Sequence, residues 1–120
     1  MAYVIKTSDE FDLWFEGQEK DLKRRIASSM QLLEAFGHRL GRPYVDTLEG
    51  SQVTNLKELR VQHRGDPYRI LFAFDPKRQA FILIGGNKAG DKHWYKTMIP
   101  KAELIFKRHL KTLEQEGNDG

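Results

Sequence analysis

Apolar residues recur at helical spacing near both ends of the chain and follow strand-like patterns between them. The strongest pattern predicts a helix from about residue 18 to Gly37, because one face is apolar at spacings of three and four. That face is formed by Leu22, Ile26, Met30, Leu33 and Phe36. Gly37 stands where a glycine commonly ends a helix.

The first residues predict a strand that leads into a shorter helix. The run AYVIKT, residues 2–7, is rich in β-forming residues, and TSDE follows it. Thr7 is expected to cap the helix, with Glu10 completing a capping box. One apolar face then comes from Phe11, Trp14 and Phe15. The two helices are expected to form a hairpin or a kinked rod.

The middle of the chain predicts a sheet. Residues 38–55 form a polar, irregular connector, long enough to be a functional loop. Three runs separated by turn sequences then predict an antiparallel meander over 56–62, 68–74 and 79–84. Pro100 suits the first turn of a last helix, whose apolar stripe is Ala102, Ile105, Phe106, Leu110 and Leu113. The predicted class is α+β, with an N-terminal strand and helical hairpin packed on an antiparallel sheet and a C-terminal helix.

Length and composition indicate the number of domains and the class of protein. A chain of 120 residues with 39% hydrophobic residues suits a single domain, which we assign to residues 3–113. Residues 114–120 are rich in Gly, Asn and acids and are expected to be a disordered tail. The absence of cysteine, of a secretory leader and of a long apolar run favours a cytoplasmic protein without membrane segments.

Several kinds of chemistry lack their sequence motifs. The chain has no phosphate-binding GxxxxGK[ST], no complete GxGxxG and no GxSxG. Its four histidines do not form a metal-ligand pair, so neither a metal nor a cofactor is expected. Charge is more informative. Between residues 86 and 111, seven Lys or Arg face two acids, a local net charge of +5.

The basic residues suggest a site for RNA. Arg60 and Arg69 stand on neighbouring predicted strands and can converge on one face. The segment GGNKAGDKHWYK, residues 85–96, follows the third strand and can close over the same face, bringing Lys88, Lys92, His93, Trp94 and Tyr95. Cleavage of RNA by a ribose 2′-hydroxyl needs a proton acceptor, a proton donor and cations near phosphorus. An aromatic ring can also stack on an unpaired base.

Each of these residues also has an ordinary structural interpretation. Arg60 is typical of a solvated strand residue or of an ion-pair partner of Glu58. Arg69 interrupts an apolar strand, where an ion pair explains it as well as a functional role does. Isolated histidines, tryptophans and tyrosines more often belong to the surface or the core. Only their joint placement favours a site.

Taken together, the fragments LEG, LKELR, YRILFAFDP, AFILIGGNKAGD, WY and MIPKAE resemble the RelE/ParE toxin superfamily, on its HigB-like, phage-associated branch. The resemblance covers residues 3–113. It implies the toxin of a type II toxin–antitoxin module, neutralised by a helix-turn-helix antitoxin. RelE-like members cleave messenger RNA in the ribosome without a metal.

The resemblance also implies roles for individual residues. Arg69 and Lys88 would stabilise the transition state, Arg60 would hold the scissile phosphate, and Tyr95 or His93 would transfer protons or stack on a base. Lys92 and Trp94 are further candidates for substrate binding. Glu58 departs from the pattern, because strong ribosome-dependent nucleases have a basic residue there, so the identities of acid and base stay open.

Two alternatives remain from other functional classes. ParE-type members share the fold but poison DNA gyrase without enzymatic chemistry of their own, and an inactive nucleic-acid-binding module would need only the positive charge. The titratable groups near paired arginines favour the nuclease. Codon preference, the identity of the antitoxin and the oligomeric state do not follow from the sequence.

Overall fold

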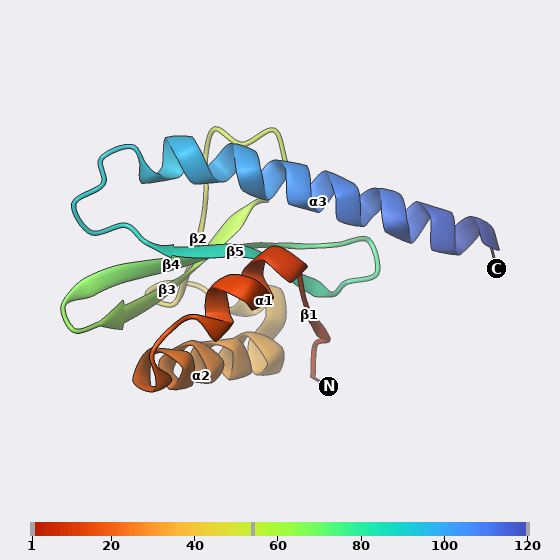
Figure 1. Cartoon of the computed structure of the whole chain (residues 1–120). Coiled ribbons are helices and arrows are strands. Elements are labelled where there is room, and N and C mark those ends of the chain that lie inside the picture. Colours follow the sequence, from red (N-terminus) through yellow and green to blue (C-terminus); the bar gives the residue numbers. More distant parts are fainter. Residues whose placement is uncertain (1, 54, 120) are drawn as a thin grey trace.

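A computed structural model describes residues 2–53 and 55–119, and side chains as far as residue 117. Its elements in chain order are β1 (Ile5–Thr7), α1 (Asp9–Glu16), α2 (Lys20–Phe36), the 3-10 helix η1 (Gly37–Arg39), β2 (Val45–Thr47), β3 (Lys57–His63), β4 (Asp66–Phe74), β5 (Ala80–Asn87) and α3 (Trp94–Asp119). The strands form one sheet in the order β1-β5-β4-β3-β2. Helices α1 and α2 lie on one face of it and α3 on the other (Figure 1). The predicted α+β class is confirmed.

The antiparallel meander of β3, β4 and β5 is confirmed, and two short strands extend it. Strand β1 pairs in parallel with β5, so the sheet is mixed rather than wholly antiparallel. Strand β2 pairs with β3, with Val45 opposite Leu59, inside the connector that the sequence predicts to be irregular. Three residues are too few to show an alternating pattern, and only the pairing with β3 defines this strand.

Both faces of the central strands are buried, because each carries a helical layer. The layer of α1 and α2 packs on one set of core residues, which includes Leu22, Ile26, Leu33, Leu59, Ile70, Phe72 and Ile82. The layer of α3 packs on a second set, which includes Leu56, Leu71, Ala73, Leu83, Trp94, Ala102, Ile105 and Phe106. This explains why ILFAF in β4 is an unbroken run without polar alternation.

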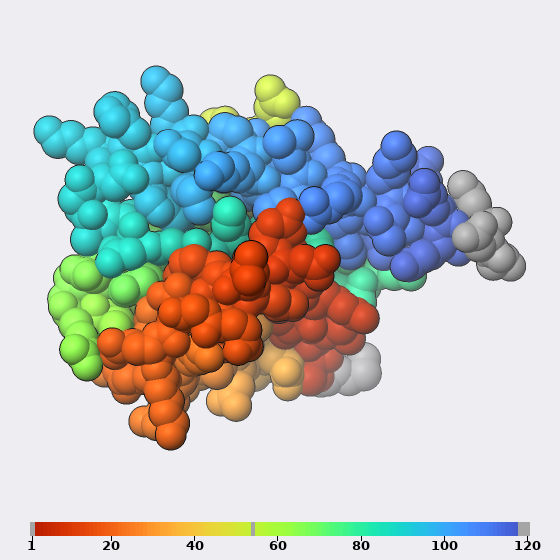
Figure 2. Space-filling model, viewed as in Figure 1, coloured from red at the N-terminus to blue at the C-terminus, as the bar shows by residue number. Residues whose placement is uncertain are grey.

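The two helical layers also meet directly. The Arg108 guanidinium of α3 donates hydrogen bonds of 2.6 and 2.8 Å to the two carboxylate oxygens of Glu10 in α1. Figure 2 shows the red start of α1 against the blue surface of α3. The layers are therefore joined by an ion pair as well as through the sheet. None of the helices that the structure describes is long and apolar enough to cross a bilayer.

The cap of α1 lies one residue later than predicted. Ser8, not Thr7, is the N-cap, and its Oγ accepts a hydrogen bond of 3.0 Å from the Phe11 N–H. The same hydroxyl donates to the Leu83 carbonyl at 2.6 Å. Thr7 is the last residue of β1 and pairs with Ile82 of β5. Its backbone belongs to the sheet, so Thr7 does not cap the helix.

Helix α3 begins six residues before the predicted start. Asp91 supplies the turn that precedes it, since its Oδ1 accepts from the His93 N–H at 2.9 Å. Pro100 lies inside the helix rather than in its first turn. Its missing N–H removes one helical hydrogen bond.

The tail also differs from the expectation. Helix α3 continues through residues 114–119, where the sequence suggests a disordered segment, and Gly120 lies outside the described residues. Glu114, Gln115 and Glu116 are good helix formers, and residues 114–117 are exposed, so this extension of the helix packs on little else. Nζ of Lys77 lies 3.9 Å from Oε2 of Glu116, so the two side chains form an ion pair between the β4–β5 turn and the end of α3.

We predict that Gly86→Ala destabilises the protein by about 1–3 kcal/mol, the usual cost of overpacking a core. A Cβ atom at Gly86 would lie 2.9 Å from Nε1 of Trp94, whose ring is buried. Urea unfolding measures the effect as a lower midpoint with an unchanged slope. Gly41→Ala is the matched control, because a Cβ there meets no atom within 4 Å. Equal midpoints for the two variants would contradict the packing of Trp94 on β5.

Candidate functional site

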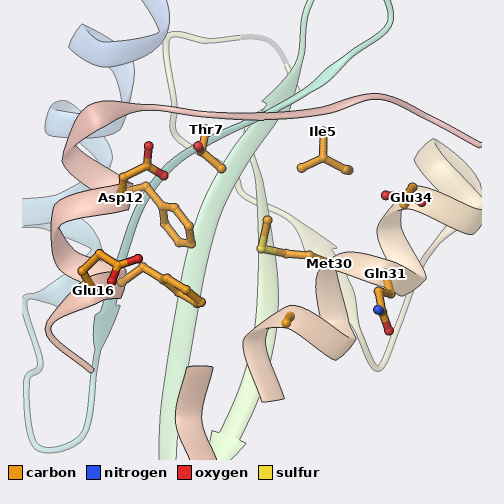
Figure 3. A pocket seen from close by; sticks show the side chains of 10 residues that line it. Ile5, Thr7, Asp12, Glu16, Met30, Gln31 and Glu34 are labelled. Carbon is orange, nitrogen blue, oxygen red and sulfur yellow. The ribbon is translucent and has the colours of Figure 1, made fainter. Parts of the chain in front are cut away.

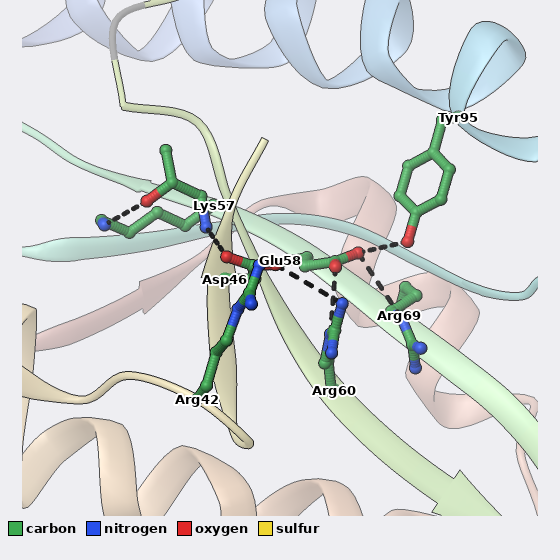
Figure 4. A network of polar contacts seen from close by, with 8 residues as sticks. Arg42, Asp46, Lys57, Glu58, Arg60, Arg69 and Tyr95 are labelled. Atoms are coloured by element: carbon green, nitrogen blue, oxygen red, sulfur yellow. Dashed lines mark hydrogen bonds and ion pairs between the residues drawn. The ribbon is translucent and has the colours of Figure 1, made fainter. Parts of the chain in front are cut away.

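The predicted convergence of Arg60 and Arg69 is present in the structure. These residues are direct partners across β3 and β4, so their side chains emerge on the same face of the sheet. It is the face that α3 covers, because Leu71 lies on the same side of β4 two residues further on. Tyr95, in the first turn of α3, reaches this face from above (Figure 4).

Glu58 lies at the centre of this group. Only 3% of its side chain is exposed. Its Oε1 accepts a hydrogen bond of 2.5 Å from the Tyr95 hydroxyl, and its Oε2 accepts one of 3.1 Å from Nε of Arg60. Nε of Arg69 lies 3.5 Å from Oε1 (Figure 4). We call Glu58, Arg60, Arg69, Lys88 and Tyr95 the Glu58 cluster.

Physical chemistry explains why these residues must come together. A buried carboxylate is costly unless cations and hydrogen-bond donors surround it. Two arginines directly opposite each other on neighbouring strands repel, and an acid between them removes the repulsion. Glu58 is therefore both the charge that the arginines neutralise and the charge that permits their close approach.

Glu58 is not among the site residues that the sequence predicts. Its alternation with Leu59 assigns it to a polar face, and polar strand faces are usually solvated. The available signal was its position two residues before Arg60, on the face that Arg69 shares. This position identifies Glu58 as a buried residue of the cluster only when α3 is known to cover this end of the sheet face.

Asp46 on β2 extends the network outward. Its Oδ2 accepts a hydrogen bond of 2.9 Å from Arg42 and one of 3.5 Å from Arg60 (Figure 4). The bond from Arg42 lowers the pKa of Asp46 below its ordinary value. Arg60 is thus held between two carboxylates, Glu58 inside and Asp46 outside, and 36% of its side chain remains exposed.

Arg69 is the more buried of the two arginines in the Glu58 cluster. Its NH1 group donates to the Tyr68 carbonyl at 3.0 Å, whereas its buried Nε forms no hydrogen bond within the described part of the chain. Only 11% of its side chain is exposed. Because this Nε faces Oε1 of Glu58 at 3.5 Å, the guanidinium has to turn away from that carboxylate before Nε can donate to another anion.

Tyr95 and Lys88 form the remaining side of the cluster. Burial raises the pKa of the Tyr95 phenol, and its hydrogen bond to Glu58 raises it further. The phenol is therefore protonated at neutral pH and acts as a donor. The Lys88 ammonium lies 5.6 Å from the centre of the Tyr95 ring, within cation–π range.

Three predicted residues lie apart from the cluster. Trp94 is 5% exposed, packs in the core beside Gly86 and is not available to stack on a base. Its large apolar ring fills the space between α3 and β5, which disfavours the predicted contact with substrate. Lys92 and His93 are exposed in the turn before α3, and within the described residues their side chains form no hydrogen bond or ion pair with the cluster.

One group elsewhere in the described residues is close enough to hold a metal ion: Glu19, Asp21 and His63. The two ring nitrogens of His63 lie 2.9 Å from Glu19 and 3.2 Å from Asp21. Since each carboxylate faces a different ring nitrogen, the arrangement suits a histidine held between two carboxylates better than three ligands around one metal.

A different kind of hollow lies between α1, α2 and β1. This groove of about 400 Å³ includes Phe11, Phe15 and Met30 in its lining (Figure 3). Asp12, Glu16 and Glu34 also line it, and they give it a negative rim. A polyanion such as RNA is repelled there, so this groove is not a candidate site for nucleic acid.

Comparison with known structures defines the class of fold. The chain superposes on a chain of the archaeal RelE–RelB complex from Pyrococcus horikoshii with a TM-score of 0.60 at 21% identity, over 75% of this chain and 99% of that one. A mutant of the E. coli toxin RelE in the free state gives a TM-score of 0.57 at 12% identity, over 78% and 92%. The fold is RelE-like.

Sequence comparison then gives the family. Residues 13–107 match the family described as phage-derived protein Gp49-like (DUF891), and the chain belongs to this family. It is 41% identical over 108 residues to HigB2 of Mycobacterium tuberculosis and 45% identical over 95 residues to HigB3, both named as candidate toxins. These matches cover 88% and 78% of this chain, so the HigB-like resemblance is confirmed. The chain spans about half the length of HigB2 (54%) and 82% of HigB3.

We predict that Tyr95 ionises at a higher pH than an ordinary tyrosine. Because its pKa in the folded state is raised above the ordinary 10.0, the stability that its phenol contributes is complete below pH 10 and is lost as pH rises through the raised value. Absorbance of tyrosinate against pH measures this, and Tyr95→Phe should remove the latest step of the titration. A Tyr95→Phe curve that loses only an ordinary step would contradict the buried hydrogen bond to Glu58.

Proposed function

We propose that this chain is the toxin of a type II toxin–antitoxin module and acts as a ribosome-dependent endoribonuclease on messenger RNA. Two relatives above 40% identity are named as candidate toxins, and RelE-like structures include one solved as a complex with RelB. Its proposed partners are a helix-turn-helix antitoxin, the ribosome and messenger RNA.

The Glu58 cluster is the observation that carries this proposal. It combines one carboxylate, two guanidinium groups, a lysine and a protonated phenol on the α3 face of the sheet. RNA cleavage requires a proton acceptor, a proton donor and positive charge near phosphorus, and the cluster offers all three.

The proposed reaction is attack of the ribose 2′-oxygen on the adjacent phosphorus. The 2′-O–P bond forms and the P–O5′ bond breaks, which leaves a cyclic phosphate and a free 5′-hydroxyl. Glu58 accepts the proton of the 2′-hydroxyl, and Tyr95 or Lys88 supplies one to the leaving oxygen. Arg69 and Lys88 stabilise the added negative charge, so the side chains themselves supply the positive charge and the reaction is proposed to be metal-independent.

Substrate binding prepares Glu58 for this role. In the free chain both of its oxygens are occupied, Oε2 by Arg60 and Oε1 by Tyr95. Arg60 is the more exposed arginine and can turn toward a phosphate, which releases Oε2 as an acceptor. In this proposal Lys92 and His93, exposed before α3, contact the RNA backbone and do not transfer protons.

A non-enzymatic function is the second candidate. It is favoured by the near-complete pairing of Glu58, which also suits a structural network beneath a binding surface. In that case the chain would inhibit DNA gyrase by binding it, as ParE-type members do, or would bind nucleic acid without cleaving it.

We predict that Arg69→Ala lowers message cleavage by about 10² to 10³, the usual effect of removing one preorganised donor to developing charge. Glu58→Gln keeps the size of the side chain and removes the proton acceptor, so it should lower the rate. Mapping of message ends in a cell-free translation extract measures both effects, with circular dichroism to verify folding.

Lys107→Ala, an exposed change on α3, is the control and should cleave like the parent. Parent-like cleavage by Arg69→Ala, Arg69→Lys and Glu58→Gln would refute the site. Growth arrest with DNA breaks and intact messages would identify the gyrase-binding function instead.

We also predict that induced expression arrests growth and that co-expression of the neighbouring antitoxin gene relieves the arrest. An antitoxin must mask or distort the basic α3 face, and opposite charges should accelerate its association at low salt. Colony counts and association rates at two salt concentrations measure this. Normal growth with abundant folded protein would contradict the toxin function.

A further inference from the structure

A second charged groove lies beside the Glu58 cluster, between the outer side of α2 and the end of β3. Its volume is about 490 Å³, within the range of ligand sites. The side chains that matter most in its lining are Arg24, Arg25, Ser28, Ser29, Tyr44 and Arg60.

The groove is continuous with the cluster through Arg60. This side chain lines the groove, and its Nε also donates to Glu58. Strand β2 stops pairing with β3 at Leu59, so the end of β3 is not covered by a neighbouring strand on this side. The backbone N–H of Arg60 donates a hydrogen bond of 2.8 Å to the backbone carbonyl of Tyr44, which holds Tyr44 beside the opening of the groove.

The charge of the groove is positive. Asp21 is the acid in its lining, and it is already engaged by Arg25 at 3.2 Å and by His63 at 3.2 Å. Arg24 is exposed and forms no ion pair with any acid of the described residues. An anion in the groove therefore meets the unpaired Arg24, the half-buried Arg60 that also pairs with Glu58 and Asp46, and two serine hydroxyls.

Tyr44 adds an aromatic surface. It is 46% exposed, and its ring has no aromatic neighbour among the described residues. Sites for single-stranded nucleic acid combine a positive groove that follows the backbone with aromatic rings on which bases stack. The groove has both features next to a candidate site for phosphate chemistry.

We propose that this groove binds the single-stranded RNA that adjoins the scissile phosphate. Arg24 and Arg25 contact the backbone phosphates, the two serines donate to phosphate oxygens, and Tyr44 stacks on a base. This inference rests on the proposed function, and it extends the site by nucleotides that the Glu58 cluster does not touch.

The test measures binding separately from cleavage. The probe is a fluorescent 2′-O-methyl nonaribonucleotide, which has RNA phosphates but no 2′-hydroxyl for attack, titrated by anisotropy at several salt concentrations. Arg24→Ala should weaken binding several-fold and reduce the slope of log K against log salt by about 0.7, the value for one phosphate contact on a single strand. Tyr44→Ala should weaken binding about tenfold, whereas Tyr44→Phe should retain it.

Matched controls are Lys107→Ala on α3 and Phe36→Ala, whose side chain is exposed to the same extent as Tyr44. Neither control should change the affinity or the salt slope. A trinucleotide probe should be insensitive to the groove variants if it occupies only the cluster. Co-sedimentation of the protein with purified ribosomes distinguishes messenger RNA from ribosomal RNA as the strand that the groove binds.

The two proposals fail in different ways. Unchanged affinity and slope in Arg24→Ala and Tyr44→Ala, together with lost cleavage in Arg69→Ala, would overturn the groove and leave the nuclease intact. Parent-like RNA binding with impaired antitoxin binding in the same variants would identify a protein-binding groove and overturn the RNA assignment. Groove-dependent RNA binding without any cleavage would support the groove and refute the nuclease.

Discussion

Burial of the Glu58 carboxylate among two arginines and a tyrosine is the constraint on which the site depends. Arg60 and Arg69 face each other across β3 and β4, and without an acid between them their charges would repel. The Tyr95 hydroxyl completes the shell and joins the first turn of α3 to β3. One carboxylate thus connects strand pairing, helix docking and the charge of the candidate site.

The position of that carboxylate follows from how α3 covers the sheet. The helix packs on β4 and β5 through its apolar stripe, while α1 and α2 cover the opposite face completely enough to bury Leu59 and Ile70. The β3 side of the α3 face carries Glu58 and Arg60 instead of apolar residues. A sheet face that changes from apolar to charged across its width provides a rigid floor for a site and leaves room for a substrate.

Opposite charges are segregated on the molecule. The hollow between α1 and α2 has a negative rim, whereas the groove along the outer side of α2 continues the positive charge of the Glu58 cluster. Helix α2 separates these two environments, because its residues contribute to both. Such a division directs a polyanion to one side of the helix and leaves the other side to partners of different chemistry.

The sequence by itself determined the elements whose period is visible locally and the placement of Arg60 and Arg69 on one face. The stripe of α2, the meander of β3 to β5 and the alternation around Leu59 all survive in the structure, because each buried face repeats over several residues. The tertiary structure determined the features that depend on contacts between distant segments of the chain. Glu58 became the centre of the site and Trp94 a core residue only because α3 lies on this face, whereas His93 was left in solvent. The three residues of β2 became a strand only beside β3. The periodicity of apolar residues shows which side of a helix or strand is buried. The segment that covers that side is distant in the chain, and the electrostatics of a buried acid depend on that segment.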